Sequence, residues 1–175
     1  MGIDIFSIFK EMKESELVEV YGVWLSELKK RGIIRTNNVI GELGEYLVIK
    51  HYNKTTRLPK LQAAPTGTQN IDAISINGDR YSIKATSGKV TGVFYGLNEP
   101  NSIEEEKQKF EYVIIAIFDK NLTLNAIYQM NWKTFLKHKR WHSRMRAWNL
   151  SITQSLLKDC DFIYEGNRSE SETIL

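Results

Sequence analysis

The stretch that decides the fold lies at residues 70–84 and reads NIDAISINGDRYSIK. β-Branched and aromatic residues flank the pair Asn77-Gly78, which is a strong short-range turn signal. Two strands are therefore predicted, over residues 70–76 and 80–86, and together they form a β-hairpin.

The register of this hairpin decides which polar side chains share a face. A two-residue turn would place Asp72 opposite Ile83 and would direct Lys84 to the other face of the sheet. A three-residue loop, or one bulge, brings Asp72, Ser82 and Lys84 to the same face. We predict such a loop, with Gly78 in the left-handed conformation that glycine adopts without strain.

A helix is predicted just upstream, from Asn37 or Asn38 to about Tyr52, because asparagine is a favoured N-cap. Glu42 and Glu45 lie near the start of this helix and follow its early turns. They add two carboxylates to the acid and the lysine of the hairpin.

The remaining segments complete one α/β domain with a mixed sheet flanked by helices. We predict this domain over residues 1–165, followed by a flexible polar tail at 166–175. The other predicted elements are a helix within 5–31, a loop over 54–69, strands over 89–97, 112–118, 125–130 and 148–153, and helices over 102–110, 132–139 and 154–159.

Composition restricts the classes of function. The chain has 175 residues and a net charge of +3, but residues 120–158 contain eight cations and no acid, so the rest of the chain carries −5. Such asymmetry indicates a basic face. The single cysteine, Cys160, excludes an intramolecular disulfide framework and a cysteine-rich zinc site. Since the first residues lack a signal-peptide pattern and no apolar run is long enough to span a bilayer, we expect a cytoplasmic protein.

The carboxylates and the lysine suit metal-dependent phosphodiester hydrolysis, which needs an activated water and neutralisation of phosphate charge. Mg²⁺, with Mn²⁺ as a substitute, prefers oxygen ligands and retains several waters. Asp72 would be the central ligand, and Glu45 would add a second carboxylate, with Glu42 one turn earlier. The backbone carbonyl of Ile83 would be a further ligand, and Lys84 would assist the attack.

This pattern resembles the PD-(D/E)XK nuclease superfamily, which includes many restriction enzymes and DNA-repair nucleases. The resemblance covers residues 38–118 and rests on Glu45 or Glu42, Asp72 and Ser82-Ile83-Lys84. It implies a restriction-endonuclease-like fold, with a four-stranded mixed sheet between helices, and Mg²⁺-dependent cleavage of DNA by Asp72, Glu45 and Lys84. Ser82 departs from the pattern because an acid usually occupies that position, which leaves it an auxiliary catalytic role. No proline precedes Asp72. The missing acid would come from Glu45, or from Glu99 or the run Glu104, Glu105 and Glu106.

Two further groups of residues are predicted to contact DNA. The first flanks the metal site and the second lies in the acid-free segment, where cations would bind phosphates with a salt-dependent affinity. These residues are Thr68, Gln69, Asn70, Thr86 and Ser87 in the first group, and Lys137, Lys139, Arg140 and Arg144 in the second.

Two other functions stay open at this point. Because Ser82 is neutral, the chain could bind nucleic acid through a nuclease fold without cutting it. Alternatively, it could be a protein-interaction module with no role in nucleic-acid chemistry. A homodimer, which would place one site on each DNA strand, is consistent with a chain too small for a separate recognition domain.

Overall fold

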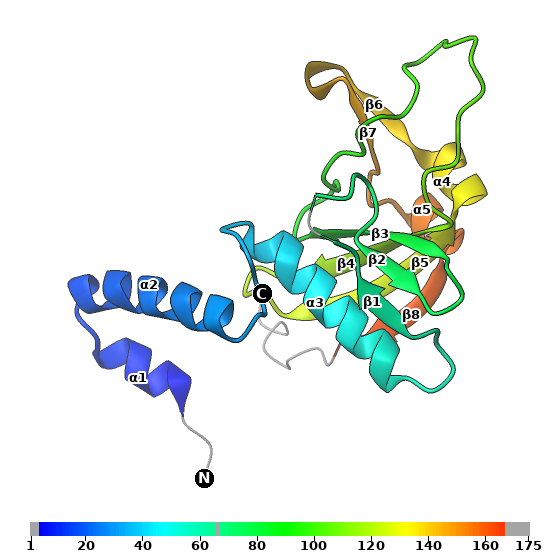
Figure 1. The fold of residues 1–175 in the computed structure, drawn as a ribbon. Helices are drawn as coiled ribbons and strands as arrows, with labels where there is room; N and C mark the ends of the chain where they lie inside the picture. The colour runs from blue at the N-terminus through cyan, green and yellow to red at the C-terminus, as the bar shows by residue number, and fades with distance from the viewer. Residues whose placement is uncertain (1–3, 66, 167–175) are drawn as a thin grey trace.

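The computed structural model describes residues 4–65 and 67–166, and it forms a mixed sheet flanked by helices (Figure 1). The sheet has six strands in the order β1-β2-β3-β4-β5-β8, in which only β3 and β4 are parallel neighbours. The coarse prediction of a mixed α/β fold is confirmed, whereas the sheet has six strands instead of four. The strands are β1 (Leu61–Ala63), β2 (Ala73–Ser75), β3 (Arg80–Thr86), β4 (Tyr112–Phe118), β5 (Leu124–Asn131) and β8 (Asp161–Glu165).

The hairpin between β2 and β3 has the predicted register. Ala73 pairs with Tyr81, and the backbone N–H of Ser75 donates to the carbonyl of Asp79, which leaves a three-residue loop. Gly78 in that loop has φ +88°, the left-handed conformation that the prediction required. The strand pairing ends at Ala73, since the N–H of Asp72 donates to the carbonyl of Tyr81. The carboxylate of Asp72 nevertheless accepts from the hydroxyl of Ser82, and Asp72 and Lys84 line one pocket.

Helix α3 (Val39–Lys54) covers one face of the sheet (Figure 1). Its predicted N-cap is confirmed, because the side chain of Asn38 accepts a hydrogen bond from the N–H of Gly41. The predicted helix within 5–31 is two helices, α1 (Ile5–Glu11) and α2 (Glu14–Lys30). The chain is extended between them at Met12 and Lys13, and the carboxylate of Glu16 accepts from the N–H of Lys13 at 2.7 Å, which stabilises the start of the second helix.

Strand β4 separates two hydrophobic clusters, which explains its continuous apolar run. Ile114 and Ala116 pack toward α3, whereas Val113 and Ile115 pack with Phe135 on the other face. Helices α4 (Trp132–His138) and α5 (Gln154–Lys158) contribute to that second cluster. A central strand buried on both faces has no solvent side for polar residues.

A small hairpin, β6 (Arg140–His142) and β7 (Ala147–Asn149), stands beside the sheet and is joined by a 3₁₀ turn at Ser143–Met145 (Figure 1). Residues 89–97 form only two isolated bridges instead of the predicted strand, Val90 with Ser151 and Phe94 with Trp148.

The helix predicted over residues 102–110 is absent from the described chain. The hydroxyl of Ser102 accepts from the N–H of Glu104 in a local turn, and the carboxylate of Glu106 accepts from the N–H of Asn98 and from Lys139. These contacts replace the helical bonds that the capping pattern predicted.

Three short strands were not predicted from the sequence, namely β1, β6 and β8. The predicted tail lies outside the described residues from position 167 onward. Within the described chain, no helix combines the length and the apolar character needed to cross a lipid bilayer.

Candidate active site

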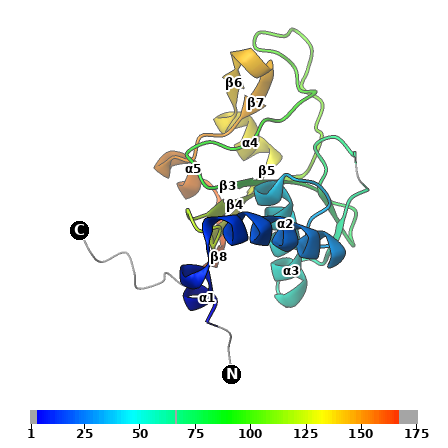
Figure 2. The same cartoon turned by 90° about the vertical axis from the view of Figure 1, so that its left-hand side faces the viewer.

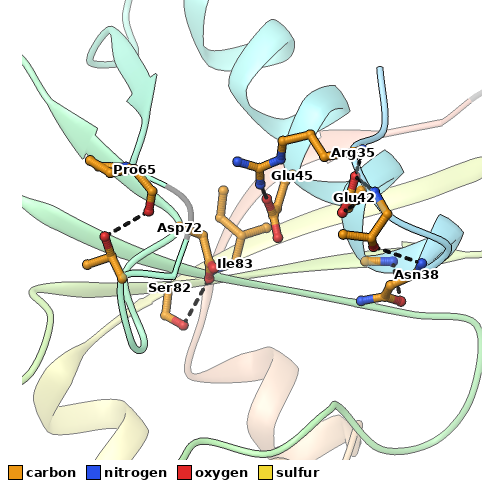
Figure 3. A network of polar contacts seen from close by, with 11 residues as sticks. Arg35, Asn38, Glu42, Glu45, Pro65, Asp72, Ser82 and Ile83 are labelled. Atoms are coloured by element: carbon orange, nitrogen blue, oxygen red, sulfur yellow. Dashed lines mark hydrogen bonds and ion pairs between the residues drawn. The ribbon is translucent and has the colours of Figure 1, made fainter. Parts of the chain in front are cut away.

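The carboxylate of Asp72 is fixed against the edge of β3 (Figure 3). It accepts hydrogen bonds from the backbone N–H of Ile83 at 2.7 Å and from the hydroxyl of Ser82 at 3.3 Å. Strand β2 begins only at Ala73, so this carboxylate occupies the position where a longer strand would supply a carbonyl acceptor. Because the N–H and C=O of one strand residue point to the same edge, the carbonyl of Ile83 faces the region of Asp72.

Ser82 has a positioning contact and no exposed surface. Its side chain is buried, and its hydroxyl points to the carboxylate of Asp72 (Figure 3). A buried hydroxyl that donates to a carboxylate holds that group in one orientation.

Glu45 reaches the same region from α3. Gly44 lies so close to β3 that a Cβ atom placed on it would overlap with the Cβ of Ala85. This close approach of helix and strand brings Glu45 toward Asp72, and Arg35 pairs with Glu45 at 3.1 Å (Figure 3).

A pocket of about 380 Å³ joins these groups. Six residues with a predicted role in catalysis, metal binding or substrate contact line it, namely Glu45, Asp72, Ile83, Lys84, Thr86 and Ser87. Ser82 and Glu42 are not among its lining residues. The lining residues are Asn38, Ile40, Gly41, Glu45, Asp72, Ile83, Lys84, Ala85, Thr86, Ser87 and Gly92. The structure thus brings together two carboxylates, a lysine and the part of β3 beyond its pairing with β2.

Glu45 has an unusual affinity for its proton. Burial, reinforced by the negative charge of Asp72, raises the pKa of Glu45 to about 7, although Arg35 opposes the shift. The side chain is 23% exposed, so part of the carboxyl group still meets water. Two neighbouring carboxylates of this kind favour the binding of a cation, because a cation offsets their mutual repulsion.

The raised pKa of Glu45 predicts a pH-dependent stability. The folded chain holds this proton up to about pH 7, whereas the unfolded chain releases it near 4.5, so stability is lost as the pH rises through that window. Between pH 5 and 8, we expect the unfolding free energy of the wild type to fall by about 2 kcal/mol more than that of Glu45→Gln. Denaturant titrations at several pH values measure this difference. Glu105→Gln, at an exposed acid, is the control, and parallel curves for wild type and Glu45→Gln would contradict the assignment.

Glu42 has a structural role that competes with metal binding. Its carboxylate accepts from the backbone N–H groups of Arg35 and Thr36, which form the turn before α3. Burial alone would raise the pKa of Glu42, but these hydrogen bonds outweigh it and hold the pKa below its ordinary value. Glu42 therefore organises the segment that supplies Arg35 to Glu45.

Lys84 lines the pocket and leans over an aromatic ring. Its ammonium nitrogen lies 4.9 Å from the centroid of the ring of Phe94, which is fully buried. The backbone of Phe94 in turn exchanges hydrogen bonds with Trp148 of the β6–β7 hairpin. This chain of contacts connects the pocket to the basic segment.

The alternative acids do not reach the pocket in the described structure. Glu99 pairs with Arg146, and Glu106 pairs with Lys139 at 2.7 Å. Glu104 and Glu105 are exposed in the preceding loop. Among the described residues, no three His, Cys, Asp or Glu side chains are grouped closely enough to hold a metal ion by themselves. Any metal here would be held by two carboxylates, a carbonyl, waters and substrate.

The loop that precedes Asp72 is held by its own polar contacts. The hydroxyl of Thr68 donates to the carbonyl of Pro65 at 2.8 Å, and the amide of Asn70 donates to the carbonyl of Tyr95 at 2.6 Å. Gln69 lies on the surface and packs near Gly96. Thr68 and Gln69 are exposed and Asn70 is half-buried, so Asn70 is the least accessible of these three predicted contacts.

The two residues after Lys84 also differ in what they offer a substrate. Thr86 is buried and its hydroxyl donates to the carbonyl of Val90, so it closes a turn. Ser87 is exposed and lines the pocket. Ser87 is therefore the residue of this pair that is available to a substrate.

The predicted basic residues divide into those that form an ion pair and those that form none among the described residues. Lys137 pairs with Asp159 at 2.6 Å, and Lys139 pairs with Glu106 while lying 4.2 Å from the ring of Trp148. The Lys139 and Glu106 side chains are only 13% and 15% exposed, so this pair holds the loop at Glu106 against the start of the hairpin and is not available to a substrate. Arg140 and Arg144 are exposed and appear in no ion pair of the described residues.

Arg35 is a site residue that the sequence did not indicate. It lies in the turn between α2 and α3, ten positions before its partner Glu45. In the sequence, Gly44 is a single glycine within a predicted helix, and such a glycine usually indicates a close packing contact. Only the packed structure shows that this reason is the contact with Ala85.

No protein-family model matches the chain, and no curated protein matches it. The functional argument therefore rests on the geometry of the pocket.

Proposed function

We propose that this protein is a Mg²⁺-dependent DNA endonuclease of restriction-enzyme-like type. The observation that carries the proposal is the meeting of Glu45, Asp72 and Lys84 around one pocket beside the edge of β3. These residues come from a helix, a strand start and a neighbouring strand, yet they supply both acids and the cation that hydrolysis of a phosphodiester requires.

The donor set fits Mg²⁺. Asp72 and Glu45 would hold the ion together with the carbonyl of Ile83, and Mg²⁺ is usually bound by one or two carboxylates with waters and substrate phosphate completing its shell. When bound, Mg²⁺ would supply charge neutralisation and a water of lowered pKa. The raised pKa of Glu45 supports this fit, because a cation between the two acids would favour their charged forms.

The residues of the chain have separate tasks in this proposal. The N–H of Ile83 and the hydroxyl of Ser82 hold the carboxylate of Asp72, and Arg35 holds Glu45. Lys84 orients the attacking water or stabilises the charge that grows on the phosphate. Ser82 thus holds the metal ligand Asp72 in position and is not itself a metal ligand.

The exposed arginines of the β6–β7 hairpin support DNA as the substrate. The hairpin is joined to the pocket through Phe94, which bonds to Trp148 and lies under Lys84. Arg140 and Arg144 are exposed and appear in no ion pair of the described residues, so we infer that these two cations bind phosphates of the DNA.

This arrangement predicts a specific salt dependence. Replacing Arg140 and Arg144 by alanine should weaken DNA binding and reduce the slope of log K against log salt by about 2, roughly 1 for each lost phosphate contact. Binding titrations in Ca²⁺, over a range of salt, measure this slope. Arg57→Ala is the control, because Arg57 follows the far end of α3, and an unchanged slope in the double variant would exclude these phosphate contacts.

Cleavage is tested with supercoiled plasmid, single-stranded DNA and mixed genomic DNA, each with Mg²⁺, Mn²⁺ or EDTA. Wild-type protein should cut only with a metal, and Lys84→Met should lose that activity while Lys54→Met, at an exposed lysine of the same helix-and-sheet body, retains it. Mg²⁺ should also raise the melting temperature at pH 8, and Glu45→Gln should reduce that rise.

The alternatives give different results in these experiments. A protein that only binds would shift DNA in a gel with no cutting and no dependence on metal. An interaction module would show background affinity for DNA that Arg140→Ala does not change. Absence of both cutting and a Mg²⁺-dependent rise in melting temperature would overturn the proposal.

A further inference from the structure

Helices α1 and α2 form an arm that leaves the body of the molecule (Figures 1 and 2). Among the described residues of these two helices, none is buried. Large apolar side chains are nevertheless frequent on them, with exposed fractions up to 82% at Phe6 and 76% at Val18. A folded chain rarely leaves such an apolar surface uncovered, and a surface of this kind is typical of a site where a partner docks.

The apolar residues of α2 follow the spacing of a coiled-coil seam. Leu17, Tyr21, Trp24 and Leu28 are separated by four, three and four positions, which is the alternation of core positions in a heptad. The rings of Tyr21 and Trp24 lie 6.4 Å apart, so these two side chains share one face. Among the seam residues, Leu17, Tyr21 and Trp24 are exposed.

We propose that a second copy of this chain covers the seam, with the two α2 helices antiparallel about a two-fold axis between Gly22 and Val23. In that register Leu17 faces the partner's Leu28, and Tyr21 faces the partner's Trp24. Every core layer then pairs a residue with a matching residue of the other copy, as an isologous interface requires.

The charges of α2 fit the same register. Glu14 lies on the seam three positions before Leu17, and Arg31 lies on it three positions after Leu28. In this register Glu14 faces the partner's Arg31, so the acidic start of each helix meets the basic end of the other. Within one copy, Arg31 pairs with Glu27 at 2.6 Å in an exposed contact that leaves it accessible to a second acid. Parallel pairing would instead place like charges together, which disfavours it.

The charge balance of the arm disfavours a lipid surface as its occupant. Residues 4–31 contain six acids and five bases, a net charge of −1. Helices that lie on anionic membranes are rich in lysine and arginine on their polar face. A dimer formed through α2 would also lie close to the pocket along the chain, because α2 ends at the turn that carries Arg35, the partner of Glu45.

The test is sedimentation of the full chain over a range of concentrations. Wild-type protein should dimerise, and Trp24→Glu should raise the dissociation constant by about 30-fold or more, because it places a charge at the centre of the seam. Val23→Glu is the matched control, since Val23 is exposed but lies outside the seam. Circular dichroism checks that each variant folds.

A charge exchange tests the register separately. Glu14→Lys and Arg31→Glu should each weaken the dimer several-fold, and the double variant should restore it, because both inter-copy pairs are then reversed together. A monomer at every concentration, a dimer equally weakened by Val23→Glu, or a failure of the double variant to restore association would overturn the proposal. Binding of the chain to anionic lipid vesicles by the Trp24 face would also overturn it. None of these readouts depends on DNA cleavage.

Discussion

Asp72→Asn is expected to reduce metal-dependent DNA cleavage by on the order of 1000-fold, because the charge that holds the metal contributes several kcal/mol of transition-state stabilisation. Asparagine keeps an oxygen that can accept from the N–H of Ile83, so the strand edge retains its hydrogen bond. The change is therefore electrostatic, and the fold should remain. Single-turnover cleavage rates in Mg²⁺ give the measurement.

The control for this prediction comes from the same hairpin. Asp79→Asn makes the same chemical change directly after the β2–β3 loop, outside the pocket, and this variant should cut DNA as the wild type does. Asp72→Asn should also lose the rise in melting temperature that Mg²⁺ causes. If Asp72→Asn retained the wild-type rate, Asp72 would not be the central ligand, and a site built on Glu45 alone would have to be considered.

Gly44→Val is expected to lower the free energy of unfolding by about 3 kcal/mol, because its Cβ would overlap with Ala85 and the added methyl groups enlarge the conflict. For a chain of this size that corresponds to a fall in melting temperature of roughly 10 °C. The helix must move away from β3 to relieve the overlap, and Glu45 moves with it. Thermal and denaturant unfolding measure the first effect.

Gly22→Val provides the matched control for Gly44→Val. A Cβ at Gly22 meets no atom within 4 Å, so this substitution in a helix should change stability by less than about 0.5 kcal/mol. Adding Ala85→Gly to Gly44→Val should recover part of the loss, since it removes the methyl group that the new side chain meets. Equal stability of Gly44→Val and wild type would show that the contact between helix and strand is not tight.

The β2–β3 hairpin shows how far local sequence can carry a prediction. Asn77-Gly78 and the alternation around it predicted both strands, and the requirement that Asp72 share a face with Lys84 predicted a three-residue loop. The same holds for the N-cap at Asn38, because a cap is satisfied by atoms within three residues of one another.

The segment from residue 89 to 110 shows where local patterns fail. A strand and a capped helix were predicted there, but Phe94 bonds to Trp148 and Glu106 bonds to Lys139, both far away along the chain. Such contacts exceed the small free energies of local propensity, so the chain adopts an irregular path that only the packed structure reveals.

The basic segment was similarly ambiguous. Sequence alone grouped Lys137, Lys139, Arg140 and Arg144 as cations without nearby acids, and that composition indicated a basic face. The folded chain brings Asp159 to Lys137 and Glu106 to Lys139, so two of these four cations have structural partners. Charge counts along a chain do not show which charges are neutralised in space.

The sequence by itself determined the elements that depend on near neighbours, namely the hairpin, its glycine turn, the capped helix and the buried strand β4, because turn conformations, caps and hydrophobic periodicity act over a few residues. It did not by itself decide whether Asp72 and Lys84 share a face, because that depends on the length of the loop at Asn77-Gly78. Only the tertiary structure decided that Gly44 packs on Ala85, that Glu45 thereby meets Asp72 with a raised pKa, and that Ser82 is buried as a support. Burial and through-space charge depend on residues far apart in the chain, and no local pattern encodes them.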